Sequence, residues 1–98
     1  MDSKRLLGIT GFQWDQGNLE KNWLKHGVSP LAREQVFFNQ PLVVAPDLRH
    51  SQHEERLFVL GRTDTDRYLF VVFTVRRRKL RVISARDMSR KERMIYGA

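Results

Sequence analysis

The sequence has no cysteine among its 98 residues. Disulfides, thiolate nucleophiles and cysteine-ligated zinc are therefore excluded, which suits a reducing cytoplasm. The longest apolar stretch, LFVVFTV at 69–75, is too short to cross a bilayer, and the N-terminal MDSKRLLGITGF lacks the apolar segment of a signal peptide. We expect a cytoplasmic protein with no membrane partner.

Proline and glycine are scarce, at three and six residues, and neither a repeat nor a low-complexity linker divides the chain. With 41% hydrophobic and 30% charged residues, the composition is that of an ordered globular protein. A chain of this length can bury one core but not two. We predict a single domain over 1–98, with 1–10 as a loosely ordered leader.

Positive charge, in contrast, is abundant and unevenly placed. The net charge is +7, and residues 1–48 contain five Lys or Arg against five Asp or Glu, whereas 49–98 contain thirteen against six. Nine of these basic residues fall in RRRKLRVISARDMSRKERMIY at 76–96. An even spread of arginine merely solvates a surface, but this asymmetry favours a nucleic acid or an acidic protein as the partner of the second half.

Turn and capping signals in the first half predict a short strand and two helices. The strand is FQW at 12–14, and a helix then begins at Asp15 and ends at Gly27. Ser29 is the expected N-cap of a second helix, with Pro30 at its first position and Pro41 beyond its end.

The second half predicts strands and a last helix. β-rich segments occur at 42–45, 57–62, 68–75 and 80–85, and short turns make the last three an antiparallel meander. Ser89 and Glu92 have the spacing of a capping box for a helix that reaches Tyr96. The order predicts an α+β domain with the helices on one face of the sheet, which leaves the other face or an edge free for a site.

Three stretches together resemble the BrnT family of toxins from bacterial type II toxin–antitoxin systems: WDQGNLEKNWLKHGVS (14–29), HSQHEERLFVLGRT (50–63) and FTVRRRKLRVISARDMSRKERMIY (73–96). The resemblance covers nearly all of the chain after Gly11. It implies a RelE-like ribonuclease fold, with two N-terminal helices packed on a mainly antiparallel sheet of four to five strands and a C-terminal helix. One departure is the turn at 76–79, which often carries glycine in relatives and has none here.

The resemblance also implies an activity and partners. The activity is cleavage of RNA that arrests translation, with no cofactor. The partners are RNA and a BrnA-like ribbon-helix-helix antitoxin that neutralises the toxin, and DNA is contacted only through the antitoxin.

Cleavage of RNA without a metal uses the substrate's own 2′-hydroxyl as the nucleophile, so the enzyme must accept a proton, stabilise a charged phosphate and protonate the leaving oxygen. Arginine suits the second task because its planar guanidinium binds phosphate through two nitrogens and stays protonated. Arg62, Arg76 and Arg86 each end a predicted strand, and we hypothesise that they converge on one open pocket as catalytic residues. The alternative is that Arg86 pairs with the last helix and Arg62 with Asp64 or Asp66.

His50 and Glu54, in the HSQHEER segment, are candidate catalytic residues because either can accept the proton. The alternative is that Ser51 and the glutamates cap a turn and pair with Arg56. His50 and His53 lack the spacing of zinc sites, and we expect no metal.

Further basic and aromatic residues are candidates for binding RNA. Lys25 and His26 end the first helix, where the helix dipole alone explains a cation, and only the resemblance suggests a phosphate contact. Tyr96 either stacks on a base or pins the last helix to the sheet. Five cations are expected to position phosphates with steep salt dependence and little sequence choice, and to attract an acidic antitoxin segment: Lys79, Arg81, Arg90, Lys91 and Arg93. A rival hypothesis is a basic module that binds nucleic acid or protein without cleaving.

Overall fold

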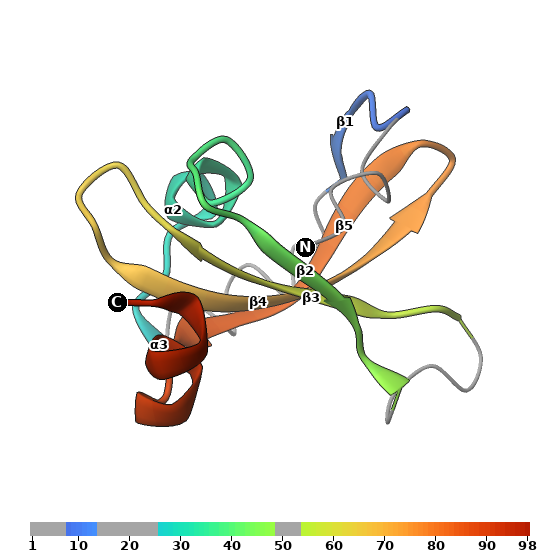
Figure 1. The fold of residues 1–98 in the computed structure, drawn as a ribbon. Coiled ribbons are helices and arrows are strands. Elements are labelled where there is room, and N and C mark those ends of the chain that lie inside the picture. Colours follow the sequence, from blue (N-terminus) through green and yellow to red (C-terminus); the bar gives the residue numbers. More distant parts are fainter. Residues whose placement is uncertain (1–7, 14–25, 49–53) are drawn as a thin grey trace.

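The computed structural model describes residues 8–13, 26–48 and 54–98. Its centre is a five-stranded sheet in the order β1-β5-β4-β3-β2 (Figure 1). The elements are β1 (Gly11–Gln13), α2 (Pro30–Gln35), β2 (Val43–Pro46), β3 (Leu57–Arg62), β4 (Tyr68–Arg76), β5 (Lys79–Asp87) and α3 (Arg90–Tyr96). Strands β2 to β5 are antiparallel, whereas β1 runs parallel to β5. The predicted α+β class and mainly antiparallel sheet are therefore confirmed.

Helix α2 begins where the local sequence signals predict. Ser29 is the N-cap of α2, its hydroxyl accepts a hydrogen bond from the Ala32 amide at 3.1 Å, and Pro30 is the first helical residue. The helix ends at Gln35, earlier than expected, because tighter bonds take over: the Phe37 amide donates to the Glu34 carbonyl at 3.1 Å. The helix predicted to begin at Asp15 falls largely on 14–25, outside the described residues.

The β4–β5 turn shows how the chain forms a tight hairpin without glycine. Arg76 pairs with Lys79, so Arg77 and Arg78 form the two-residue loop. Their φ values are 50° and 65°, in the left-handed region that such hairpin loops need and that glycine or asparagine usually fills. The left-handed backbone costs roughly 1–2 kcal/mol per residue at Arg77 and Arg78. The turn places four cations, residues 76–79, at one end of the sheet.

The two faces of the sheet are covered by different helices. Alternate residues such as Val59, Val71 and Phe73 form a core with Val36, just beyond α2, on one face. On the other face, Leu60 packs against Tyr96 of α3 and against Met88, which precedes the helix. Figure 1 shows α2 and α3 on opposite sides of the sheet. The expectation that the helices share one face is wrong for these two, because strand alternation gives the meander two apolar faces.

Helix α3 is defined at both ends. The predicted capping box is present between Ser89 and Glu92, and Gly97 ends the helix with φ of 87°. The Tyr96 hydroxyl donates to the Pro41 carbonyl at 2.6 Å, which attaches the helix to the segment before β2. No helix in the described part of the chain is long and apolar enough to span a membrane.

Gly61 gives a direct test of this packing. A Cβ at this position would lie 3.0 Å from the Val36 Cβ and 3.1 Å from the Val36 carbonyl oxygen, so the residue after α2 would have to move off β3. We expect Gly61→Ala to lower the free energy of unfolding by about 1–3 kcal/mol, as overpacking does. Urea denaturation measures this loss, and Gly11→Ala, whose Cβ meets nothing within 4 Å, is the matched control. Equal stability of the two variants would contradict the packing.

Candidate functional site

A groove lies on the sheet face that α3 covers only in part. Its volume is about 630 Å³. Strands β3, β4 and β5 form its floor, and the chain just after β2 and just before β3 forms its rim. It is lined by Pro46, Asp47, Leu48, Arg56, Phe58, Phe70, Val72, Ile83, Ser84 and Arg86. The described lining thus combines two arginines and one carboxylate with an apolar, partly aromatic floor.

An aromatic platform forms the middle of the groove. Phe58 and Phe70 come from β3 and β4, and their rings stack with centroids 5.2 Å apart and planes inclined by 29°. The guanidinium carbon of Arg86 lies 4.2 Å from the centroid of Phe70, a cation–π contact. Both rings remain half-buried. A flat aromatic surface beside a cation is the arrangement on which nucleic-acid bases stack.

A β-bulge in β5 decides that Arg86 reaches this face. Val72 pairs with Ser84 and the next residue of β4, Phe73, pairs with Val82, so Ile83 is the extra residue. Because side chains alternate along a strand, regular pairing from Val82 onward would have turned Arg86 towards the buried core. The bulge reverses the alternation and places Arg86 over Phe70 instead.

Arg86 forms a bidentate ion pair with Glu92 of α3. Its Nη1 and Nη2 atoms lie 2.7 and 2.9 Å from the two carboxylate oxygens of Glu92, and Nη1 also donates to the Asp87 carbonyl at 3.1 Å. Hydrogen bonding from Arg86 lowers the pKa of the Glu92 carboxyl below its usual range. The pairing of Arg86 with the last helix, the alternative left open by the sequence, is therefore present. It fixes the guanidinium at the groove and leaves 40% of that side chain exposed.

The three catalytic candidates do not converge. Arg62 donates to the Gln40 carbonyl at 2.8 Å and to Asp66 at 2.9 Å, and it does not line the groove. Arg76 forms a bidentate pair with Glu54 near the hairpin end of β4. It lies six residues from Phe70, the cross-strand partner of Arg86, which is roughly 20 Å along the strand. The hypothesis of a shared pocket is wrong because all three arginines share a face but not a position along it.

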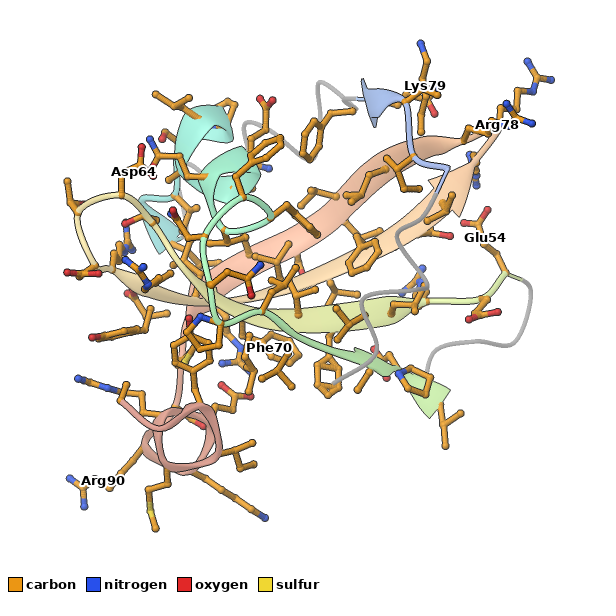
Figure 2. All side chains as sticks on the ribbon, turned by 45° about the horizontal axis from the view of Figure 1, so that its top comes forward. Glu54, Asp64, Phe70, Arg78, Lys79 and Arg90 are labelled. Atoms are coloured by element: carbon orange, nitrogen blue, oxygen red, sulfur yellow. The ribbon has the colours of Figure 1, made fainter. Side chains whose placement is uncertain are left out.

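Of the two candidate proton acceptors, Glu54 and His50, the structure describes only Glu54. The hydrogen bond from Arg76 lowers the pKa of the Glu54 carboxyl, which makes this group a weaker proton acceptor than an ordinary glutamate. Glu54 forms an ion pair with Arg76, and the charge of Arg56, the partner that the sequence suggested, also lowers its pKa. Figure 2 shows Glu54 towards the end of the sheet that carries Arg78 and Lys79, away from Phe70. His50 lies outside the described residues.

The RNA-binding candidates are spread over the molecule. Lys79 is exposed at the hairpin and Arg90 on α3, at opposite ends of the sheet (Figure 2), while Arg81 is half-buried on β5. Tyr96 is buried, its hydroxyl is engaged, and burial raises its pKa, which matches the alternative that it pins α3. Lys25 lies outside the described residues.

The backbone at His26 is part of a hydrogen-bond network around Arg67, the residue just before β4. The Nη2 atom of Arg67 donates to the His26 carbonyl at 2.9 Å, and its Nη1 atom donates to the Gly27 carbonyl at 2.8 Å. The same guanidinium pairs with Asp87 at 2.7 Å, and this hydrogen bond lowers the pKa of the Asp87 carboxyl. The backbone at His26 is thereby tied to the beginning of β4 and the end of β5.

Sequence reasoning missed Phe58, Phe70, Arg56 and Ser84. The period-2 pattern of β3 and β4 puts each phenylalanine on the face opposite the core, which is a signal the sequence does contain. What the sequence lacks is the register, since the two rings meet only because Phe58 pairs with Val72 and Leu60 with Phe70. No group of three or more potential metal ligands occurs in the described part of the chain.

The fold and the groove define a small protein that offers an anionic ligand an arginine beside an aromatic platform. A family model described as the ribonuclease toxin BrnT of type II toxin–antitoxin systems matches residues 14–92. The chain therefore belongs to the BrnT family of ribonuclease toxins, which implies RNA as substrate and an antitoxin as partner.

A solved structure supports the fold independently. The crystal structure of the ribonuclease toxin BrnT from Brucella abortus superimposes with a TM-score of 0.65 and 24% identity, covering 83% of this chain and 99% of that chain. At this identity the likeness shows the fold alone. A search of curated proteins finds no significant match.

The Arg86–Glu92 pair predicts a pH dependence of stability. Because the folded-state pKa of Glu92 lies below the ordinary value of 4.5, the pair stabilises the fold fully above that value, and the contribution is lost as the pH falls through the lowered pKa. Glu92→Gln keeps the capping box but removes the charge. We expect the wild type to lose about 1 kcal/mol more than this variant between pH 6 and pH 3, measured by urea denaturation.

Ser89→Ala is the control for that measurement. It removes the hydroxyl that caps α3 and should lower stability by about 1 kcal/mol at every pH, with the acid-dependent loss largely preserved. An acid-dependent loss of the same size in Glu92→Gln and the wild type would show that the pair does not stabilise the fold.

Proposed function

We propose that this chain is a metal-independent endoribonuclease and that a single RNA strand binds in the groove on the open sheet face. The observation that carries the proposal is the position of Arg86, fixed by Glu92 and held 4.2 Å from the Phe70 ring at an open groove. Arginine in this setting combines a phosphate contact with a neighbouring surface for a base.

The groove provides charge for the transition state. Arg86 is oriented by two hydrogen bonds from its own guanidinium to Glu92, so little conformational entropy is lost when a phosphate meets its exposed edge. Arg56 lines the same groove from the residue before β3. The Arg86 guanidinium offsets the additional negative charge that develops on the non-bridging oxygens as the 2′-oxygen attacks. Arg56 adds positive charge elsewhere in the groove.

The chemistry follows from the substrate. The 2′-hydroxyl loses a proton to a base and forms a bond to the adjacent phosphorus, while the bond to the 5′-oxygen breaks and that oxygen takes up a proton. The products are a 2′,3′-cyclic phosphate and a 5′-hydroxyl. His50 is the proposed base, because imidazole is the side chain best suited to proton transfer near neutral pH and because Arg76 makes Glu54 a weak acceptor.

The cellular role follows from the family. Cleavage of RNA in the cytoplasm arrests translation, and a BrnA-like ribbon-helix-helix antitoxin neutralises the enzyme, which contacts DNA only through that partner. Basic residues outside the groove, at the β4–β5 hairpin, hold the backbone of the RNA strand and give salt-dependent affinity. Membership in a ribonuclease family favours this function over a basic module that binds without cleaving.

Product analysis tests the chemistry. In the presence of excess EDTA, the purified protein should convert a single-stranded RNA into fragments that end in a 2′,3′-cyclic phosphate, detected by mass spectrometry, because no step requires a metal. Fragments with a 5′-phosphate, or activity lost in EDTA and restored by a divalent cation, would contradict the mechanism. Saturable binding with no turnover would support the binding module instead.

Substitution of Arg86 tests the site. Arg86→Lys keeps a positive charge but loses the planar fork, and we expect kcat/KM for RNA cleavage to fall about 100-fold or more, the size seen when a transition-state donor is removed. Arg76→Ala is the matched control, because it also removes an arginine from an arginine–carboxylate pair on the same face, roughly 20 Å along the strand from Arg86. It should change kcat/KM less than 10-fold. Equal losses in both variants, with circular dichroism unchanged, would refute a site centred on Arg86.

A further inference from the structure

The outer surface of α3 carries large apolar side chains that are not packed in the core of the protein. Met94 and Ile95 are 76% and 63% exposed, although the helix has only seven residues. The inward residues already have their functions, since Glu92 holds Arg86 and Tyr96 packs beneath the helix. Two large adjacent apolar side chains in solvent are typical of a surface that another protein covers.

A hollow adjoins Met94. Its volume is about 290 Å³, and it is lined by Met88, Arg90, Arg93, Met94 and Ala98. Met88 is buried and forms an apolar bottom, while the two arginines stand at the rim. A hollow with an apolar bottom and a charged rim accepts one anchoring side chain of a partner, the arrangement that concentrates binding energy in protein interfaces.

The charge around the hollow selects the partner. Arg90 and Lys91 are exposed, and neither side chain makes a hydrogen bond or an ion pair within the described part of the chain. The acidic residue of α3, Glu92, is already paired with Arg86. With a net charge of +7 on the whole protein, an acidic partner is both attracted and oriented towards this surface.

We propose that the outer surface of α3, formed by Met94, Ile95 and the adjoining hollow, is the docking site for an acidic amphipathic segment of the antitoxin. The segment places an apolar side chain in the hollow and carboxylates beside Arg90 and Lys91. The proposal rests on membership in a toxin–antitoxin family and not on the chemistry proposed for RNA cleavage.

The apolar character distinguishes a protein from RNA as the occupant. An RNA backbone gains nothing from Met94 and Ile95, and the described surface of α3 offers no exposed aromatic ring for a base, since Tyr96 is buried. Methionine adapts its shape to a partner and is favoured at protein interfaces. Helix α3 is connected to the groove through Glu92, which holds Arg86.

The test uses the full-length toxin and the protein encoded by the gene next to it. In the double variant Met94→Gln/Ile95→Gln, which alters no charge, we expect the Kd measured by calorimetry to rise about 30-fold, as loss of a hot spot does. Leu31→Gln is the matched control, because Leu31 is 65% exposed on α2, on the other side of the sheet. It should leave the Kd within twofold, and cleavage of RNA by the free toxins should be unchanged in both variants.

Two outcomes would overturn the proposal. One is an unchanged Kd in the double variant, or an equal loss in Leu31→Gln. The other is a double variant that loses affinity for RNA while it keeps its affinity for the antitoxin, which would make α3 part of the RNA surface. Failure of the proposed nuclease chemistry would instead leave the calorimetric result intact.

Discussion

The site depends on one irregularity of the sheet, the β-bulge at Ile83. The pairs on either side of it, Val72 with Ser84 and Phe73 with Val82, show that β5 carries one residue more than β4 needs. Without the extra residue, the side chains that follow would exchange faces, and the Arg86 guanidinium would point into the apolar core. With it, Ala85 stays in the core and Arg86 joins the aromatic platform.

The same strand then positions the rest of the site. Because Arg86 emerges on the open face, Glu92 of α3 can meet it with both carboxylate oxygens, and the capping box sets that glutamate at the start of the helix. One short helix is thus attached to the sheet by an ion pair near its beginning and by Tyr96 at its end. It covers one end of the open face, leaves the half-buried aromatic platform accessible, and presents Met94 and Ile95 to solvent.

Local signals in the sequence predicted most of the elements, and tertiary contacts decided the rest. The bounds of β3, the N-cap at Ser29 and the capping box were predictable, because each depends on residues near one another in the chain. The pairing of Arg62 with Asp66 was foreseen as an alternative for the same reason. The bulge and the placement of helices on two faces were not, since each depends on partners distant in sequence. Three arginines at strand ends therefore suggested one pocket, whereas register spread them along the sheet.

The central claim is that RNA lies in the groove against Arg86 and the Phe58–Phe70 platform. It is tested most directly by NMR titration of the labelled protein with a single-stranded RNA that is 2′-O-methylated throughout and so cannot be cleaved. The account predicts the largest shifts at the Arg86 side chain, at both phenylalanine rings and at the methyl groups of Val72 and Ile83. Shifts confined to the basic hairpin at 76–79, with the groove residues unmoved, would contradict it.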